Sequence, residues 1–309
     1  MPTRREFLRG SSFTVAGSLL MSARAGPATA AAGARPLQVR KIPATGEAVP
    51  VIGMGTSGSF EVSLDGAEYR ALAEVLKRFI AAGATLIDTA PTYGNAEDVL
   101  GRLLEESEAR TRVFLATKLS GVRGRARGFA QFERTLRTLR TDRVELLQVH
   151  NLRDWKSQLA VARELKQQGK VRYVGVTHYL ESAQDELADI VQATKPDFLQ
   201  INYSVTQRNA ERRVFPLARD LGIAVLANRN FDDGALFRRV RGKALPEWAA
   251  EAGIASWAQM FLKFVLSEPA VTAVIPATGK PDRQSDNLGA GVGPLLTPAQ
   301  KAQVVELIG

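Results

Sequence analysis

The sequence predicts an α/β fold in which eight parallel strands alternate with helices and close into a (β/α)8 TIM barrel. Short runs rich in apolar and β-branched residues recur after about residue 37, and amphipathic segments with helical periodicity separate them. Eight such units are the number that closes this barrel, and we expect a single domain after the N-terminal segment. A doubly wound open sheet is the alternative, and the count of eight units argues against it.

The strands are expected where the apolar runs lie. In chain order these runs are VIGMG, TLIDTA, RVFLATK, VELLQVH, VRYVGVTH, FLQINYS, AVLANR and VTAVIPAT. Ahead of the first run, residues 37–50 read LQVRKIPATGEAVP, which predicts an N-terminal β-hairpin placed to plug the bottom of the barrel.

The helices are predicted from apolar residues spaced three and four positions apart. Residues 67–83 place five apolar side chains on one face before a closing glycine, namely Leu72, Val75, Leu76, Phe79 and Ile80, then Gly83. Residues 182–194 and 210–222 have the same periodicity, although Pro216 lies inside the second segment. A last helix is expected within residues 297–309.

Residues 1–30 are predicted to be a targeting segment and not part of the fold. Arg4 and Arg5 precede a mildly apolar run at residues 11–23, and small residues with A-x-A patterns follow near residues 28–30. This order is typical of a signal peptide, and the arginine pair indicates the twin-arginine export machinery as a partner. We therefore expect a periplasmic or otherwise exported protein whose domain covers residues 31–309. A disordered basic tail with an accidental arginine pair is the alternative.

Composition argues against several other classes of function. The formal net charge is +9, but part of it belongs to the N-terminal segment, and no basic face with interleaved aromatic residues follows, so no nucleic-acid partner is expected. With no cysteine and two histidines, neither disulfides nor a metal centre are expected. No later segment is apolar and long enough for a membrane helix, so we expect no stable membrane insertion after cleavage. The basic loop at residues 121–128 is either solvated or attracts an acidic substrate.

Four side chains of complementary chemistry fall at the ends of consecutive predicted strands. Asp88 ends the second strand and Tyr93 lies in the following loop; Lys118 and His150 end the third and fourth strands. In a barrel of this class, these strand ends meet at one mouth, where the chemistry takes place. Each residue alone has an ordinary structural explanation: the aspartate could cap a helix, the tyrosine could pack, the lysine could be solvated and the histidine could make a structural hydrogen bond. Their occurrence together predicts a catalytic site.

The four side chains suit the reduction of a carbonyl group, which needs a hydride on carbon and a proton on oxygen. Tyr93 is the predicted proton donor, and the ammonium of Lys118 is expected to favour the phenolate and lower the Tyr93 pKa. Asp88 would hold and partly neutralise Lys118. His150 would donate a hydrogen bond to the carbonyl oxygen as charge develops there.

With these residues in place, the chain resembles the aldo-keto reductases over nearly everything after residue 37. The stretch DTAPTYGNAE (residues 88–97) is similar to the most diagnostic signature of that family, and GMGT (residues 53–56) is similar to its first-strand motif. The resemblance implies a barrel that binds NADPH in an extended pose without a Rossmann domain. It also implies a small-molecule carbonyl substrate and a catalytic tetrad of Asp88, Tyr93, Lys118 and His150.

The same resemblance implies cofactor contacts at most strand ends. Gly55 and Thr56 belong to the first-strand motif, and Thr177, His178 and Gln200 match residues that contact the carboxamide. The stretch IPATGKPDRQSDN (residues 275–287) aligns with the strand-eight motif that holds the adenosine end. There Thr278 and Arg283 match contacts to the 2′-phosphate, and Asp286 and Asn287 match contacts to adenine.

The chain also departs from the family's pattern. Asn228 stands where an aromatic residue usually stacks on nicotinamide, so Arg229 or Phe231 is expected to contact the cofactor instead. Ala277 stands where a lysine is often seen, and Lys280 is the residue that could compensate. NADPH is therefore the expected cofactor, with NADH possible. NLRDW follows the histidine in place of a near-adjacent tryptophan, so one wall of the substrate pocket is expected to differ. The chain ends soon after its last helix, so we expect a substrate cleft that is open on that side.

Three functions are consistent with these observations. The first is an active NADPH-dependent carbonyl reductase, the second a nicotinamide-binding sensor or regulatory module without turnover, and the third another barrel enzyme such as a lyase or hydrolase. The tetrad favours the first over the second, because a binding module has no need of Tyr93. The strand-eight motif argues against the third. Loops determine the substrate in this fold, so the sequence does not specify it.

Overall fold

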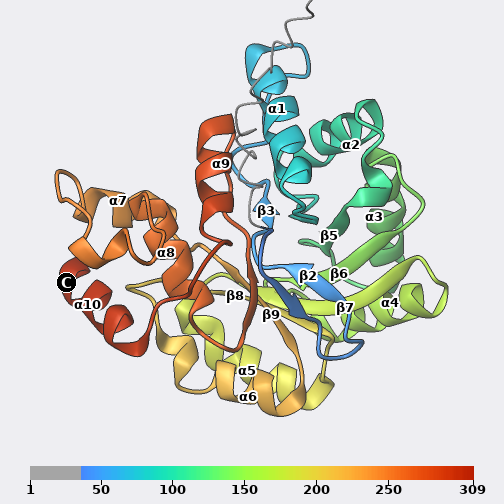
Figure 1. Ribbon diagram of the computed structural model, residues 1–309. Coiled ribbons are helices and arrows are strands. Elements are labelled where there is room, and N and C mark those ends of the chain that lie inside the picture. Colours follow the sequence, from blue (N-terminus) through green and yellow to red (C-terminus); the bar gives the residue numbers. More distant parts are fainter. Residues whose placement is uncertain (1–35) are drawn as a thin grey trace, which may run out of the picture. The chain divides into compact units, whose positions relative to one another are not determined.

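The structure, a computed structural model, describes residues 36–309. The predicted signal peptide and its cleavage site lie outside the described residues. The centre is an eight-stranded sheet with the order β10-β9-β8-β7-β6-β5-β4-β3, and all neighbours in it are parallel (Figure 1). Its strands are β3 (Met54–Gly55), β4 (Leu86–Asp88), β5 (Phe114–Leu119), β6 (Val144–His150), β7 (Val171–His178), β8 (Phe198–Asn202), β9 (Ala224–Asn228) and β10 (Val271–Val274).

The first and last strands meet, so the sheet curls into a nearly closed barrel. Isolated parallel bridges join Ile52 to Val274 and Gly55 to Ala277. A Cβ atom on Gly55 would lie 2.9 Å from the carbonyl oxygen of Ile275, so glycine is the residue that permits this approach. The predicted (β/α)8 TIM barrel is confirmed.

Helices connect the strands around the outside of the sheet (Figure 1). They are α1 (Ala67–Ala81), α2 (Ala96–Glu106), α3 (Arg125–Thr138), α4 (Trp155–Gln167), α5 (Gln184–Thr194), α6 (Val214–Leu221), α7 (Ala235–Arg239), α8 (Trp257–Leu266), α9 (Pro281–Gly289) and α10 (Pro298–Ile308). Short 3-10 turns are η1 (Arg110–Arg112), η2 (Glu181–Ala183), η3 (Asn209–Glu211), η4 (Asp232–Gly234) and η5 (Glu247–Ala249). Within residues 36–309, no helix combines the length and apolar content that crossing a membrane requires.

The expected helices form, and one begins later than its periodicity suggests. Helix α1 buries Leu72, Val75, Leu76 and Phe79 as predicted. Helix α6 begins at Val214, and not near residue 210, which places Pro216 in its first turn. The amide groups of a first turn have no partner within the helix, so proline is tolerated there and not further along.

Apolar side chains fill the barrel interior, and the N-terminal hairpin closes its lower end. The hairpin pairs β1 (Val39–Lys41) with β2 (Ala48–Pro50) in antiparallel register. Its buried Ile42 and Val49 join one interior cluster with residues from the strands, namely Leu86, Phe114, Ala116, Leu146, Tyr173, Phe198, Ala224, Leu226, Ala273 and Ile275. A larger cluster lies between the strands and the helices.

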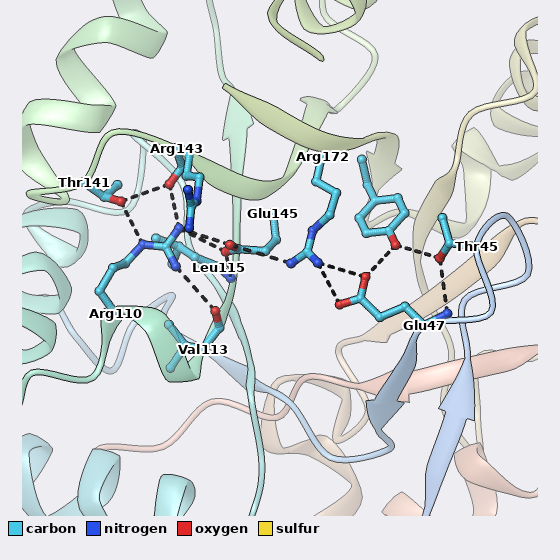
Figure 2. Close-up of polar contacts among 10 residues, drawn as sticks. Thr45, Glu47, Arg110, Val113, Leu115, Thr141, Arg143, Glu145 and Arg172 are labelled. Atoms are coloured by element: carbon cyan, nitrogen blue, oxygen red, sulfur yellow. Dashed lines mark hydrogen bonds and ion pairs between the residues drawn. The ribbon is translucent and has the colours of Figure 1, made fainter. Parts of the chain in front are cut away.

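A chain of charged groups fixes this hairpin to the barrel floor (Figure 2). Glu47 in the hairpin turn accepts from Arg172 Nη1 at 3.0 Å and from the Tyr173 hydroxyl at 2.6 Å. Arg172 also lies 3.7 Å from Glu145 on β6, and Arg110 lies 3.1 Å from the same carboxylate. The network thus connects the hairpin with β7, β6 and η1 at the end of the barrel opposite the mouth.

Candidate active site

The carboxyl ends of the strands surround a cavity of about 620 Å³. Eleven of the seventeen residues predicted as site residues line it, namely Gly55, Thr56, Asp88, Tyr93, His150, Thr177, Gln200, Asn228, Arg229, Phe231 and Arg283. Lys118 lies outside this lining and is buried, with 1% of its surface exposed. The barrel thus brings the predicted tetrad and a large part of the predicted cofactor site to one place.

Lys118 and Asp88 form a buried ion pair beneath the cavity. The Lys118 Nζ atom donates to Asp88 Oδ2 at 2.6 Å and to the Thr89 carbonyl at 2.8 Å. It also lies 4.9 Å from the centre of the Tyr93 ring. Burial acts to lower the Lys118 pKa, but the Asp88 carboxylate and Tyr93 act in the opposite direction and leave it raised. Lys118 therefore remains an ammonium in this environment.

Tyr93 lies in the loop between β4 and α2, and its ring lies against Lys118 and His150. Burial raises the Tyr93 pKa, whereas the Lys118 charge lowers it, and the net direction is upward. Lys118 acts on the Tyr93 pKa in the predicted direction. The Tyr93 pKa is nevertheless raised and not lowered, because the cost of removing the phenolate from water exceeds the stabilisation by the Lys118 charge. A phenol with a raised pKa carries its proton at neutral pH.

His150 ends β6 and contacts Tyr93 edge-to-face, with ring centroids 5.9 Å apart and an interplanar angle of 84°. Burial lowers the His150 pKa to about 3, helped by the charges of Lys118 and His178. The imidazole is therefore neutral at physiological pH. Its Nδ1 atom is 2.7 Å from the Ser120 hydroxyl oxygen.

A chain of amide hydrogen bonds extends from Asp88 across the bottom of the cavity, near the carboxyl ends of the strands. Asp88 Oδ1 accepts from Gln148 Nε2 at 3.2 Å and from Gln200 Nε2 at 2.9 Å. Because a carboxylate only accepts, Gln200 must present its oxygen on the other side, where it accepts from Thr177 and Asn228 at 3.1 and 3.3 Å. The orientation of each amide therefore follows from the charge on Asp88.

The chain ends in acceptors that lack a donor. Asn228 uses its amide nitrogen on Gln200, and its Oδ1 atom is buried without a partner in the described part of the chain. Asn230 donates to the carbonyls of Tyr203 and Asn228 at 3.2 and 3.4 Å, and its Oδ1 atom is likewise unpartnered. Both residues line the cavity. Carboxamide and ribose hydroxyl groups of a nicotinamide nucleotide are donors that fit such acceptors.

The loop after β9 has a strained course beside these asparagines. Arg229, Asp232 and Asp233 have positive φ angles of 53°, 49° and 50°. The Arg229 guanidinium pairs with Asp233 and lies 5.0 Å from the centre of the Tyr179 ring. Phe231 packs on Phe237 at 5.0 Å between ring centroids. Arg229 and Phe231 both line the cavity beside Asn228.

The predicted adenosine site is only partly assembled. Arg283 on α9 lines the cavity, and within residues 36–309 it has no ion pair or side-chain hydrogen bond, which leaves it available for a phosphate. Asp286 is occupied: its two carboxylate oxygens accept from Ser256 and Gln259 at 2.7 Å each. Thr278 and Asn287 are buried and Lys280 is exposed, and none of them lines the cavity.

His178 is the remaining predicted contact that does not line the cavity. Its Nδ1 atom accepts from the Leu180 amide at 3.1 Å, and its ring stacks on Tyr179. Its assignment to the carboxamide stays a prediction, as do the assignments of Thr278, Lys280, Asp286 and Asn287.

Sequence reasoning missed several residues of the site. Ser120 and Gln148 lie two positions from Lys118 and His150, and alternate residues of a strand share a face, so the spacing carried a usable signal. Ser120 and Gln148 do not line the cavity themselves. The missed residues that do line it include Asn151, Tyr179 and Asn230 from loops and Phe237 from α7. No periodicity predicts the course of such segments.

Comparisons with known proteins agree with this geometry. A sequence model described as the Aldo/keto reductase family matches residues 51–308. Aldo-keto reductase YhdN of Bacillus subtilis (strain 168) is 30% identical over 234 residues, which cover 70% of this chain and 67% of that protein. An NADH-specific methylglyoxal reductase of Escherichia coli (strain K12) is 28% identical over 185 residues, or 50% of this chain and 54% of that protein. The crystal structure of an aldo-keto reductase from Klebsiella pneumoniae in complex with NADPH superimposes with a TM-score of 0.73 at 25% identity, covering 89% of this chain and 95% of that one.

Proposed function

Because the chain belongs to the aldo/keto reductase family, we propose that it is an NAD(P)H-dependent oxidoreductase that reduces an aldehyde or ketone to an alcohol. The observation that carries this proposal is the buried Lys118–Asp88 pair, 2.6 Å between charged atoms, placed beside Tyr93 and His150 at the cavity. A structural barrel core gains little from burying such a pair, because removing two charges from water is costly.

The four side chains divide the proton chemistry between them. A nicotinamide cofactor, when bound, would supply the hydride that the carbonyl carbon needs. Tyr93, protonated because its pKa is raised, gives its proton to the carbonyl oxygen, and the Lys118 ammonium stabilises the phenolate that remains. Asp88 holds that ammonium in place. Neutral His150 donates a hydrogen bond to the carbonyl oxygen as negative charge develops on it.

The cofactor would lie along the polar floor of the cavity. The unpartnered acceptors of Asn228 and Asn230, together with Thr177 and Gln200, would bind the carboxamide and ribose. The Arg283 guanidinium would bind a phosphate group of the cofactor. The Arg229 guanidinium could also bind phosphate once its ion pair with Asp233 is broken. Gly55 and Thr56 complete this wall of the cavity.

We propose NADPH as the preferred cofactor, with NADH as the competing one. Arg283, which lines the cavity, and Lys280, which does not, would supply positive charge for a 2′-phosphate, whereas Ala277 supplies none. The relatives include an enzyme named as NADH-specific and a structure containing NADPH, so the family alone does not decide. Binding constants for both cofactors, measured side by side, would decide it.

The test of the proposed function is a panel of aldehydes, ketones and quinones with NADPH and with NADH, followed by the absorbance of the reduced nicotinamide. Turnover of at least one carbonyl class is expected. If the protein binds NADPH but turns over none of them, the regulatory module without turnover becomes the better explanation. Failure to bind either cofactor would contradict both.

We further propose that the protein is exported by the twin-arginine route. Arg4 and Arg5 support this, together with the apolar and small-residue segments behind them. That route carries folded proteins, so the barrel could bind its cofactor before export, and a ligand that binds the folded form also stabilises it. Replacing both arginines with lysine should retain active, uncleaved precursor in the cytoplasm. Mature periplasmic protein from that variant would contradict the route, and nucleotide-free periplasmic protein unable to bind cofactor would contradict the loading.

A further inference from the structure

The serine that follows β5 contacts the imidazole of His150 at its Nδ1 atom. Ser120 is 3% exposed, and its hydroxyl oxygen lies 2.7 Å from His150 Nδ1. We propose that Ser120 is a positioning residue that donates to His150 Nδ1 and thereby keeps the single imidazole proton on Nε2. The tautomer of His150 is inferred from the hydrogen-bond geometry alone. The effect of that tautomer on catalysis rests on the proposed reductase function.

The direction of this hydrogen bond follows from counting donors. A neutral imidazole has one proton, on Nδ1 or on Nε2. If Nδ1 carried it and donated to Ser120, the serine hydroxyl proton would need another acceptor, and the Ser120 hydroxyl has no second partner anywhere in residues 36–309. If Ser120 donates instead, its buried hydroxyl proton has an acceptor, and the imidazole proton lies on Nε2 of a ring that lines the cavity. A buried donor left unpaired is more costly than an acceptor with a spare lone pair, so the second arrangement is favoured.

Ser120 is itself held by a side chain from outside the barrel. Gln131 on α3 accepts from the Ser120 amide through Oε1 at 2.8 Å and donates to the Ser120 carbonyl through Nε2, also at 2.8 Å. Gln131 is 7% exposed. One buried amide therefore fixes both main-chain groups of Ser120, which holds the backbone in the position from which the hydroxyl reaches His150.

The consequence for chemistry lies at the other ring nitrogen. His150 lines the cavity, and its Nε2 atom has no hydrogen-bond partner among the described residues. With the proton on Nε2, the ring offers a carbonyl oxygen a donor. The opposite tautomer would offer it a lone pair, which repels the oxygen and removes the stabilisation when charge develops.

Nitrogen NMR of ring-labelled histidine tests the tautomer directly. The chain contains two histidines, His150 and His178, so the spectrum is simple, and a His178→Gln variant assigns it. In the wild-type protein at pH 7 we expect His150 to show a protonated Nε2 and an unprotonated Nδ1. In Ser120→Ala we expect a mixture of tautomers. A protonated Nδ1 in the wild type, or an unchanged tautomer in Ser120→Ala, would overturn the proposal.

Kinetics provides the second arm. Ser120→Ala should lower kcat for a carbonyl substrate by about tenfold, the usual effect of one hydrogen bond, and leave NADPH affinity unchanged. Ser120→Thr keeps the hydroxyl and should restore most of kcat. Ser204→Ala is the matched control, because it removes another fully buried hydroxyl that bonds to the Gln207 amide and not to His150. Equal losses in Ser120→Ala and Ser120→Thr would refute a role for the hydroxyl.

The two arms separate this proposal from the proposed function. If no carbonyl substrate is turned over but the NMR result holds, the reductase function fails and the Ser120 assignment stands. If turnover is found and the tautomer does not depend on Ser120, the reductase function is supported and the Ser120 assignment fails.

Discussion

Gln200 and Asp88 are joined across the barrel by a hydrogen bond of 2.9 Å, from the Gln200 amide nitrogen to Asp88 Oδ1. The second carboxylate oxygen of Asp88 accepts from Lys118 at 2.6 Å. One carboxylate thus connects the ammonium proposed to act on Tyr93 with the amide proposed to hold the cofactor. Changes at Asp88 should therefore affect both catalysis and cofactor binding.

Asp88→Asn should destabilise the protein, because it leaves the buried Lys118 ammonium without a counter-charge. We expect a loss of about 3–5 kcal/mol in the free energy of unfolding, measured by urea denaturation. Adding Lys118→Met should recover part of that loss. The control is Glu164→Gln, which breaks an exposed pair with Arg125 and should cost less than about 1 kcal/mol. Equal losses of unfolding free energy in Asp88→Asn and Glu164→Gln would contradict the argument that the buried charge is the cause.

Tyr93→Phe should reduce carbonyl turnover by about 100-fold or more, because the phenol proton has no substitute in phenylalanine. NADPH affinity, measured by fluorescence titration, should remain nearly unchanged. Tyr179→Phe is the matched control: it removes another tyrosine hydroxyl from a residue that lines the cavity, and this variant should keep its turnover. Near-normal turnover by Tyr93→Phe would remove Tyr93 from the role of proton donor.

Position 228 allows stacking and hydrogen bonding to be measured separately. Asn228→Ala and Asn228→Tyr both lose the hydrogen bond to Gln200, but only tyrosine restores an aromatic platform for nicotinamide. The tyrosine variant should therefore bind NADPH about fivefold more tightly than the alanine variant, equivalent to roughly 1 kcal/mol. Equal affinities would mean that the nicotinamide ring does not pass over this position.

His150 should contribute to loss of stability in acid. Its pKa is about 3 in the folded protein and near 6.5 when unfolded, so the unfolded state binds an extra proton between these values. Stability from this group is complete above about pH 6.5 and falls as the pH drops toward 3, with a slope of at most about 1.4 kcal/mol per pH unit. Unfolding free energies at pH 7 and pH 5 should therefore differ less in His150→Gln than in the wild type. The same dependence in both would show that His150 titrates normally.

The fold was predictable because its signals are repeated along the chain. Eight apolar runs and the intervening periodic segments each point to the same barrel, and an error in one, such as the late start of α6 at Val214, changes little. The meeting of these side chains at one end of the barrel was predictable for a related reason: Asp88, Lys118 and His150 end or nearly end their strands, and parallel strand ends meet at one side.

The remaining features depend on distances that the sequence does not contain. The hydrogen bonds of Asp88 to Gln148 and Gln200 arise from side chains crossing the barrel interior, 60 and 112 residues apart along the chain. The Tyr93 pKa depends on how deeply its ring is buried, and that burial outweighs the neighbouring ammonium. Neither quantity follows from residue type or spacing.

The hairpin that closes the barrel floor also has a kinetic consequence. Arg40 in the hairpin donates to main-chain carbonyls that lie 226 to 231 residues further along, at Leu266, Glu268 and Val271. These contacts form only after α8 and β10 have been synthesised, so the first described strands of the chain are among the last to reach their native contacts. Docking of the hairpin therefore requires that the last strand of the barrel is already present.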